Sequence, residues 1–292
     1  MKISGMGVAL ATPFKFDGSL DEFSLRKLID YVVEGGADFL VALGTTSEAA
    51  TMSVSERYRV MEIVLEQNNG RLPVMVGLGG NCTRDVAEAV GSFPYLKYCH
   101  SILCVTPYYN KPSQEGLYQH FKTVAESAAK PVCLYNVPGR TSVNMSAETT
   151  IRISHDCPNV FAIKEACGDL QQMTEILRDV REGFTVFSGD DGNALPFISM
   201  GGHGVISVIG NLFPREFSNM IKLSLEGHFQ EGSKLHLKLA PFYRLLFKEG
   251  NPAGVKACLH AKGVINENVL RLPLTPVSSE LYDKMKALLY SI

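Results

Sequence analysis

Val160-Phe161-Ala162-Ile163-Lys164-Glu165-Ala166 is a short apolar run that ends in an amine. Runs of this length that are rich in Val, Ile and Phe are typical of buried strands. A helical pattern follows over residues 170–180. This unit, a buried strand followed by a helix, repeats through the first two thirds of the chain, and the repetition decides the fold class.

Apolar runs and helical patterns alternate along the chain. The expected strands cover residues 7–12, 39–43, 73–76, 101–105, 131–135, 160–164, 184–188 and 204–208. The expected helices cover residues 24–34, 54–67, a stretch that opens near 83, and residues 113–128, 146–153, 170–180 and 194–200. Eight such units predict an α/β fold of the TIM, or (β/α)8, barrel type. An open, doubly wound sheet is the alternative, but the short and regular spacing favours closure.

The remainder of the chain is helical in pattern. We expect one helix after residue 214 to close the barrel and the last helices to form a small C-terminal bundle. The expected division is a barrel with the active site over residues 1–225 and a C-terminal helical region over residues 226–292. Gly250-Asn251-Pro252-Ala253-Gly254 is interpreted as a break within that region, since Gly and Pro interrupt helices.

Composition excludes several classes of function. The 28 basic and 30 acidic residues give a net charge of −2, which offers no electrostatic basis for binding nucleic acid. No apolar run is long enough for a membrane span, and the N-terminus lacks a secretory pattern. The seven cysteines include no Cys-x-x-Cys pair, as in reduced cytoplasmic proteins. The seven histidines lack metal-site spacing, so no metal site is expected.

Lys164 and Tyr135 are the central pair of the predicted site. They end the sixth and fifth expected strands, and neighbouring strands lie about 4.8 Å apart, so their side chains can touch if both point inward. Burial favours a neutral amine, which can attack a ketone to form a Schiff base, and a phenol can shuttle protons beside it. The ordinary alternatives are a solvated lysine and a tyrosine that caps the core.

Other strand ends carry groups that suit carboxylates. Thr45 and Thr46 offer two hydroxyls and two backbone amides, although threonines more often cap helices. Tyr108 and Tyr109 follow the fourth strand, and adjacent residues in an extended segment point in opposite directions, so one can serve the site. Arg140 lies on a loop stiffened by Pro and Gly, where a guanidinium can bind a carboxylate in bidentate fashion; the alternative is a solvated arginine.

Six segments together resemble the signature segments of the pyruvate-dependent Schiff-base aldolase and lyase family. The resemblance covers the chain from near Gly7 to beyond Lys256, and the segments occur in the expected order at strand ends. They are Gly44-Thr45-Thr46-Ser47-Glu48, Val105-Thr106-Pro107-Tyr108-Tyr109-Asn110-Lys111-Pro112, Tyr135-Asn136-Val137-Pro138-Gly139-Arg140-Thr141, Ile163-Lys164-Glu165-Ala166, Ser188-Gly189-Asp190-Asp191 and Gly201-Gly202-His203-Gly204-Val205-Ile206-Ser207.

The resemblance implies catalytic roles residue by residue. It implies that Lys164 forms the Schiff base with pyruvate and that Tyr135 relays protons at the bound substrate. Thr45 and Tyr109 would be the partners of Tyr135 in a hydroxyl relay, with Tyr109 contributed across a dimer contact. No cofactor or metal takes part in the implied chemistry, because the lysine itself supplies the electron sink.

The resemblance also implies the substrate-binding groups. Thr46 and nearby backbone amides would bind the carboxylate of pyruvate, and Arg140 would bind the carboxylate of the second substrate. Gly189 and Ile206 would line the pocket with main-chain groups near the lysine.

Within the family, the chain is most similar to members that condense pyruvate with L-aspartate 4-semialdehyde for lysine and diaminopimelate biosynthesis. Such members are homotetramers built from two tight dimers. One alternative is a sibling aldolase that acts on sialic acid or a 2-keto-3-deoxy sugar acid; Arg140 argues against a polyol substrate. A second alternative is a barrel that binds a keto acid without catalysis, for which the complete hydroxyl relay would have no use.

The chain departs from the family pattern at two kinds of position. Ser47 replaces a glycine and Ala49 removes a hydroxyl in the segment around Thr45. The cleft where some members bind lysine as an inhibitor is matched by Ala49, Ala50, Val54, Arg57, Asn81, Asp85 and Tyr108. Because an apolar Val54 and a cationic Arg57 suit a cationic amino acid poorly, we expect weak or absent inhibition by lysine.

Overall fold

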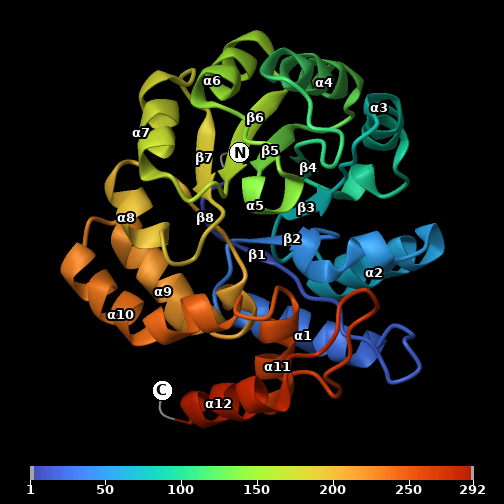
Figure 1. The fold of residues 1–292 in the computed structure, drawn as a ribbon, viewed down its shortest axis with the longest axis vertical. Coiled ribbons are helices and arrows are strands. Elements are labelled where there is room, and N and C mark those ends of the chain that lie inside the picture. Colours follow the sequence, from blue (N-terminus) through green and yellow to red (C-terminus); the bar gives the residue numbers. More distant parts are fainter. Residues whose placement is uncertain (1–2, 291–292) are drawn as a thin grey trace.

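A closed parallel barrel forms the centre of the computed structural model, which describes residues 3–290 (Figure 1). The described strands pair in sequence order, and β8 closes the barrel against β1. This closed sheet confirms the predicted TIM barrel. The strands are β1 Gly5–Ala9, β2 Phe39–Ala42, β3 Val74–Gly77, β4 Ser101–Val105, β5 Val132–Asn136, β6 Val160–Glu165, β7 Thr185–Ser188 and β8 Gly204–Ser207.

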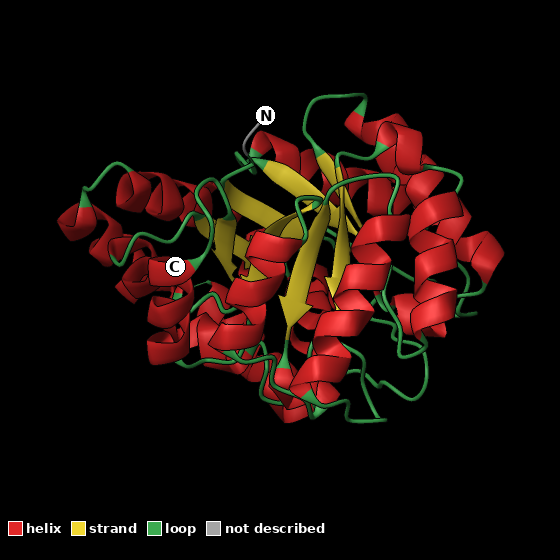
Figure 2. Cartoon of the chain, turned by 90° about the horizontal axis from the view of Figure 1, so that it is seen from above, coloured by secondary structure: helices red, strands yellow, loops and turns green. Residues whose placement is uncertain are grey.

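Helices surround the barrel on its outer side, as the view from above shows (Figure 2). Those of the barrel are α1 Glu22–Glu34, α2 Val54–Asn68, α3 Thr83–Ser92, α4 Gln114–Ser127, α6 Ala147–Asp156, α7 Leu170–Asp179, α8 Ala194–Ser199 and α9 Pro214–Leu225. The short helix α5 (Pro138–Thr141) and the 3-10 turns η1 (Thr45–Ser47) and η2 (Ala49–Thr51) follow β5 and β2. The sequence did not predict these three elements, because a single turn leaves no periodicity to detect.

The first strand differs from its predicted bounds. We expected residues 7–12, but β1 ends at Ala9. The backbone N–H of Ala11 donates to the side chain of Asn211 at 3.1 Å instead of joining the sheet. The apolar run therefore continues beyond the residue where the hydrogen bonds of the sheet stop. The other strands and helices that the sequence predicted differ from their predicted bounds only by shifts at their ends.

Two apolar layers fill the structure because side chains alternate between the faces of each strand. The larger layer lies between the strands and the helices. The smaller one fills the barrel interior and comprises Ile3, Ala9, Phe39, Val41, Met75, Leu103, Cys133, Tyr135, Val137, Ala162, Phe187 and Ile206. The interior is thus a packed core, and functional groups can be reached only at its ends.

The C-terminal helices gather along one side of the barrel, in orange and red in Figure 1. They are α10 Phe229–Leu245, α11 Ala253–Ala261 and α12 Ser279–Leu289. α10 packs on α9 and α12 packs on α11. The division of the chain at residue 225 into two domains stays a prediction. Among residues 3–290, no helix combines the length and apolar character that crossing a membrane requires.

Candidate active site

Lys164 and Tyr135 lie side by side at the carboxyl ends of β6 and β5. They are direct partners in the register of the two strands. Lys164 Nζ lies 4.4 Å from the centroid of the Tyr135 ring. Both residues are buried, with exposed fractions of 5% and 6%. The structure therefore brings together the amine and the phenol as the sequence predicted.

A polar network on the outer face fixes the end of β6. Glu165 points away from the barrel interior and is fully buried. Its carboxylate accepts from Asn136 Nδ2 at 2.9 and 3.0 Å, from the backbone N–H of Cys167 at 2.8 Å and from Gln172 Nε2 at 3.1 Å. Burial raises the pKa of Glu165, while these donors oppose the rise. The network ties β6 to β5 and α7, which holds the neighbouring Lys164 in place.

A pocket of about 570 Å³ opens above this pair. It collects predicted residues from four different strand ends, namely Thr45, Thr46, Tyr135, Arg140, Lys164 and Gly189. Its other lining residues come from the barrel and from the end of α10, including Arg244, Phe247 and Lys248. The pocket is a concave site with an amine at its floor and cations at its rim.

The two threonines after β2 have different environments. Thr46 is buried, and its Oγ1 accepts from Asn251 Nδ2 at 3.0 Å. Thr45 is exposed and lines the same pocket. One hydroxyl is thus fixed by a hydrogen bond, and the other faces the open pocket.

Arg140 lies on the helix α5 at the rim of the pocket, not on an irregular loop as expected. One guanidinium nitrogen donates to the backbone oxygen of Asn251 at 3.2 Å, and the side chain is otherwise exposed. Asn251 therefore contacts both Thr46 and Arg140, and its own Oδ1 is buried without a partner among the described residues. Sequence reasoning treated Asn251 only as part of a helix break and missed this role.

Gly189 lies where a side chain would be crowded. A Cβ there would lie 2.5 Å from the Cβ of Ala166, which no side chain could tolerate without a shift. Its N–H donates to Glu165 O at 2.7 Å. Ile206 is fully buried in the barrel interior, in register with Gly7 on β1, and its predicted main-chain role stays a prediction.

Tyr109 lies outside the pocket. It is 89% exposed, and its backbone adopts a φ of +75°. Tyr108, in contrast, lines a neighbouring cavity of about 490 Å³ that shares Thr45 and Tyr135 with the active-site pocket. Within one protomer Tyr109 is not among the residues that line the pocket, so its predicted role in a hydroxyl relay requires a second copy of the chain and stays a prediction.

Asp191 is a buried carboxyl in the pocket wall. Its Oδ2 accepts from the backbone N–H groups of Val208 and Ile209 at 3.1 and 2.8 Å. Burial raises the pKa of Asp191 to about 6, against the backbone hydrogen bonds that lower it. The Oδ1 of its neighbour Asp190 accepts from the backbone N–H of Asn193 at 3.1 Å.

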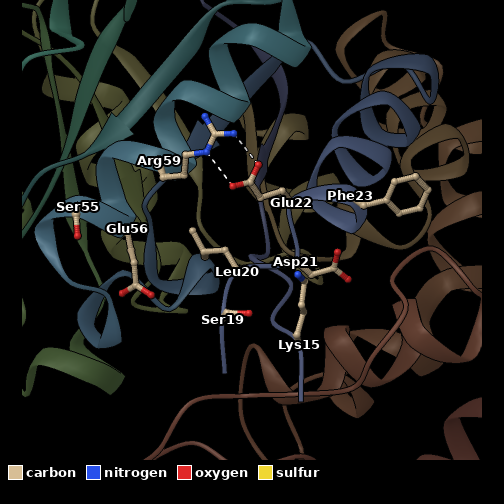
Figure 3. A pocket seen from close by; sticks show the side chains of 9 residues that line it. All are labelled: Lys15, Ser19, Leu20, Asp21, Glu22, Phe23, Ser55, Glu56 and Arg59. Atoms are coloured by element: carbon tan, nitrogen blue, oxygen red, sulfur yellow. Dashed lines mark hydrogen bonds and ion pairs between the residues drawn. The ribbon is translucent and has the colours of Figure 1, made fainter. Parts of the chain in front are cut away.

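Two larger cavities offer no comparable chemistry. One, of about 680 Å³, lies between the N-terminal ends of α1 and α2 (Figure 3). There Glu22 and Arg59 point toward one another and form an ion pair at 2.6 Å. The other, of about 850 Å³, is lined by residues near the N-terminal ends of β3 and β4. Across residues 3–290, no group of three or more His, Cys, Asp or Glu side chains could hold a metal ion.

Comparison with known proteins identifies the family. The model of the dihydrodipicolinate synthetase family matches residues 2–292. The chain belongs to the dihydrodipicolinate synthetase family. A relative in this family, the 4-hydroxy-tetrahydrodipicolinate synthase of Phocaeicola vulgatus, is 50% identical over 288 residues, which cover 99% of this chain and 96% of the relative.

Solved structures from the same family agree with the barrel. The dihydrodipicolinate synthase of Thermotoga maritima superposes with a TM-score of 0.96 at 40% identity, and the match covers 100% of this chain and 99% of the other. A monomeric dihydrodipicolinate synthase variant superposes with a TM-score of 0.95, also at 40% identity, over 99% of this chain and 96% of the variant. Membership in the family thus rests on both sequence and structure over the whole length.

Proposed function

We propose that the protein is a lyase that condenses pyruvate with L-aspartate 4-semialdehyde to 4-hydroxy-tetrahydrodipicolinate. The observation that carries the proposal is the buried contact between Lys164 and Tyr135 at the floor of the pocket. Family relatives that share half of the sequence bear the name of this activity. The product is an intermediate of lysine and diaminopimelate biosynthesis, which is the role we propose for the protein in the cell.

The first half of the reaction takes place at Lys164. The Lys164 amine attacks the ketone of pyruvate, and loss of water from the carbinolamine gives an imine. The Tyr135 hydroxyl donates the proton that leaves with the water and then accepts a proton from the methyl group, with Thr45 as its relay partner. Loss of that methyl proton converts the imine to an enamine. Thr46 and the backbone of its turn bind the carboxylate of pyruvate during these steps.

The second half of the reaction requires a second carboxylate site. Arg140 lines the same pocket and suits the carboxylate of aspartate semialdehyde. The enamine carbon attacks the aldehyde, which forms the carbon–carbon bond and leaves an alkoxide that takes up a proton. The amine of the second substrate then attacks the imine carbon and displaces Lys164, which closes the ring and regenerates the enzyme.

The sibling aldolases remain the second candidate, since they would use the same lysine and tyrosine. The lining of this pocket carries Arg140, Arg244 and Lys248 against the carboxyls of Asp190 and Asp191, and this excess of cations favours an anionic second substrate. A polyol substrate would require a rim dominated by hydroxyl-pairing groups. The rim therefore favours the short carboxylated aldehyde over a sugar acid.

We also propose that the protein assembles as a homotetramer, a dimer of dimers, in the cytoplasm. Exposed Tyr109 supports a dimer, because its hydroxyl can join the relay only from a second copy. The free thiols of all seven cysteines agree with a reducing compartment. Sedimentation of the purified protein tests the assembly, and a stable, fully active monomer would contradict it.

Borohydride trapping tests the chemistry directly. The protein is incubated with pyruvate and borohydride, digested and analysed by mass spectrometry. We expect one reduced pyruvyl adduct, on Lys164, and none on the buried Lys256, which serves as an internal control. A protein without an adduct would leave only keto-acid binding. A coupled assay with aspartate semialdehyde, run beside sialic acid and 2-keto-3-deoxygluconate cleavage assays, then separates the synthase from its siblings.

A further inference from the structure

A fully buried ion pair attaches the loop of Thr45 and Thr46 to the C-terminal region. Lys256 Nζ donates to Glu48 Oε1 at 2.7 Å, and neither side chain is exposed to solvent. The second oxygen of Glu48 accepts from the backbone N–H of Arg271 at 3.0 Å. Buried charges require such partners. The carboxylate is therefore anchored at both of its oxygens by residues that follow the barrel in the sequence.

Glu48 is also hydrogen-bonded to the backbone of the threonine loop. It lies between the turns η1 and η2, and its N–H donates to Thr45 O at 3.1 Å. Its own carbonyl accepts from the N–H and the hydroxyl of Thr51, each at 3.0 Å. Glu48 has a φ of +57°, a conformation that disfavours residues with a Cβ. A glycine would relieve the strain, but it would lose both anchors of the carboxylate.

The same C-terminal segment holds the loop at a second point. Asn251, just before α11, donates to Thr46, and Lys256 lies within α11. Gly254 lets this helix approach the end of α10 closely, since a Cβ there would lie 2.2 Å from Leu246 O. The start of α11 and the residues just before it thus present Lys256 and Asn251 to the loop at a fixed separation.

Two cations, Lys256 and Arg271, pack against the ring of Phe14 beside the buried ion pair. Lys256 Nζ lies 4.4 Å and the guanidinium carbon of Arg271 4.3 Å from the ring centroid of Phe14, which is itself fully buried. Arg271 also donates to Thr51 O at 3.1 Å. The loop is therefore fastened at Glu48 and at Thr51, while neither Glu48 nor Lys256 lines the active-site pocket.

We propose that Glu48 and Lys256 are positioning residues, which hold Thr45 and Thr46 in the geometry that binds pyruvate beside Lys164. This inference rests on the proposed function, because that function assigns the pyruvate carboxylate to Thr46. The charge pair acts through the loop and not on the substrate. Loss of the pair is expected to weaken pyruvate binding and slow its conversion, since small displacements of positioning groups have large effects on rate.

Three full-length variants test the inference. Glu48→Gln keeps the side-chain volume and an acceptor for Arg271 but removes the negative charge beside Lys256. Glu48→Gln combined with Lys256→Met removes both charges, so that no charge is left buried without a partner. Arg59→Met is the control, because it breaks the partly exposed ion pairs of Arg59 with Glu22 (Figure 3) and Glu62, and Arg59 does not line the active-site pocket.

The readout separates positioning from stability. Active sites are counted by borohydride trapping at saturating pyruvate, and kcat is expressed per trapped site. We expect the two Glu48 variants to show a KM for pyruvate raised about 10- to 100-fold and a lower kcat per site. Arg59→Met should change the melting temperature but leave KM and kcat as in the wild-type protein.

Each other outcome has a defined meaning. Unchanged KM and kcat per trapped site in the Glu48 variants, with only fewer sites or a lower melting temperature, would overturn the inference. Should the double variant not fold, Glu48→Gln decides the question by the same readout. Absence of trapping in the wild-type protein would instead overturn the proposed function, so the two failures are distinguishable.

Discussion

Tyr135 and Lys164 occupy directly opposed positions on β5 and β6, with the Lys164 amine 4.4 Å from the centroid of the Tyr135 ring. The closed barrel produces this contact, because consecutive strands are neighbours and both side chains face the interior. The pair lies above a packed apolar core that excludes water from below. The amine lines the active-site pocket, and a substrate bound there would meet both the amine and the adjacent Tyr135 ring.

Tyr135→Phe should retain the packing of the ring but lose the hydroxyl. We expect kcat to fall about 10²- to 10⁴-fold, the usual contribution of a positioned proton carrier. The melting temperature should stay close to that of the wild-type protein, because the ring remains. Steady-state kinetics beside thermal unfolding check this prediction, and a variant with wild-type kcat would exclude Tyr135 from proton transfer.

Arg140→Gln should impair the second substrate only. Loss of hydrogen bonds to a charged partner predicts a fall in kcat/KM for aspartate semialdehyde of about 10- to 100-fold. Trapping of pyruvate on Lys164 should be unaffected. The rim also carries Arg244, and Arg244→Gln provides the comparison. A larger fall in kcat/KM in Arg244→Gln than in Arg140→Gln would show that Arg244 on α10, and not Arg140, binds the carboxylate.

Asp191→Asn should change how stability depends on pH. The pKa of Asp191 is raised from 3.8 to about 6 by burial, so between these values the folded state binds more protons than the unfolded state. The free energy of unfolding therefore falls as pH rises through this window, by roughly 3 kcal/mol for this group. Asparagine does not titrate, so the variant should lack this decrease.

Urea unfolding of both proteins at several pH values between about 4 and 7 measures the effect. Taking the difference between the two proteins removes the contribution of other groups. Among these is His120, whose pKa burial lowers to about 4 and whose slope has the opposite sign. Parallel stability profiles for wild-type protein and variant would show that Asp191 does not titrate in this range.

Gly189→Ala should destabilise the fold at the pocket wall. The new methyl group would meet the Cβ of Ala166 at 2.5 Å, and overpacking of this kind costs about 1–3 kcal/mol. Ala166→Gly removes the opposing methyl group, so the double variant should recover part of the loss. Equal stabilities for Gly189→Ala and the double variant, measured by urea unfolding, would mean that the clash is relieved elsewhere.

Lysine should inhibit the enzyme weakly or not at all. Ala49, Ala50, Val54, Arg57 and Tyr108 line one cavity beside the active-site pocket, which is where we expect an inhibitory lysine to bind. An apolar Val54 and a cationic Arg57 make this cavity unfavourable for a cationic ligand. A titration of initial rate with lysine checks the prediction, and inhibition at micromolar lysine would contradict it.

The sequence by itself determined the fold class and predicted six of the residues that line the active-site pocket, namely Thr45, Thr46, Tyr135, Arg140, Lys164 and Gly189. Apolar runs and helical periodicity are local properties, so the order of strands and helices could be predicted from them. Consecutive strands of a parallel barrel are neighbours, and the prediction that Tyr135 meets Lys164 followed from that rule alone. Local patterns also explain the error at β1, where the apolar run extends past Ala9 although the ladder does not.

Only the tertiary structure decided which distant segments complete the site. Asn251 reaches Thr46 across 205 residues of chain, and Lys256 reaches Glu48 across 208. No periodicity or spacing specifies such contacts, because they depend on how the C-terminal helices pack against the barrel as a whole. The burial that raises the pKa of Asp191 likewise depends on the residues that pack around it in the fold and not on its neighbours in the sequence.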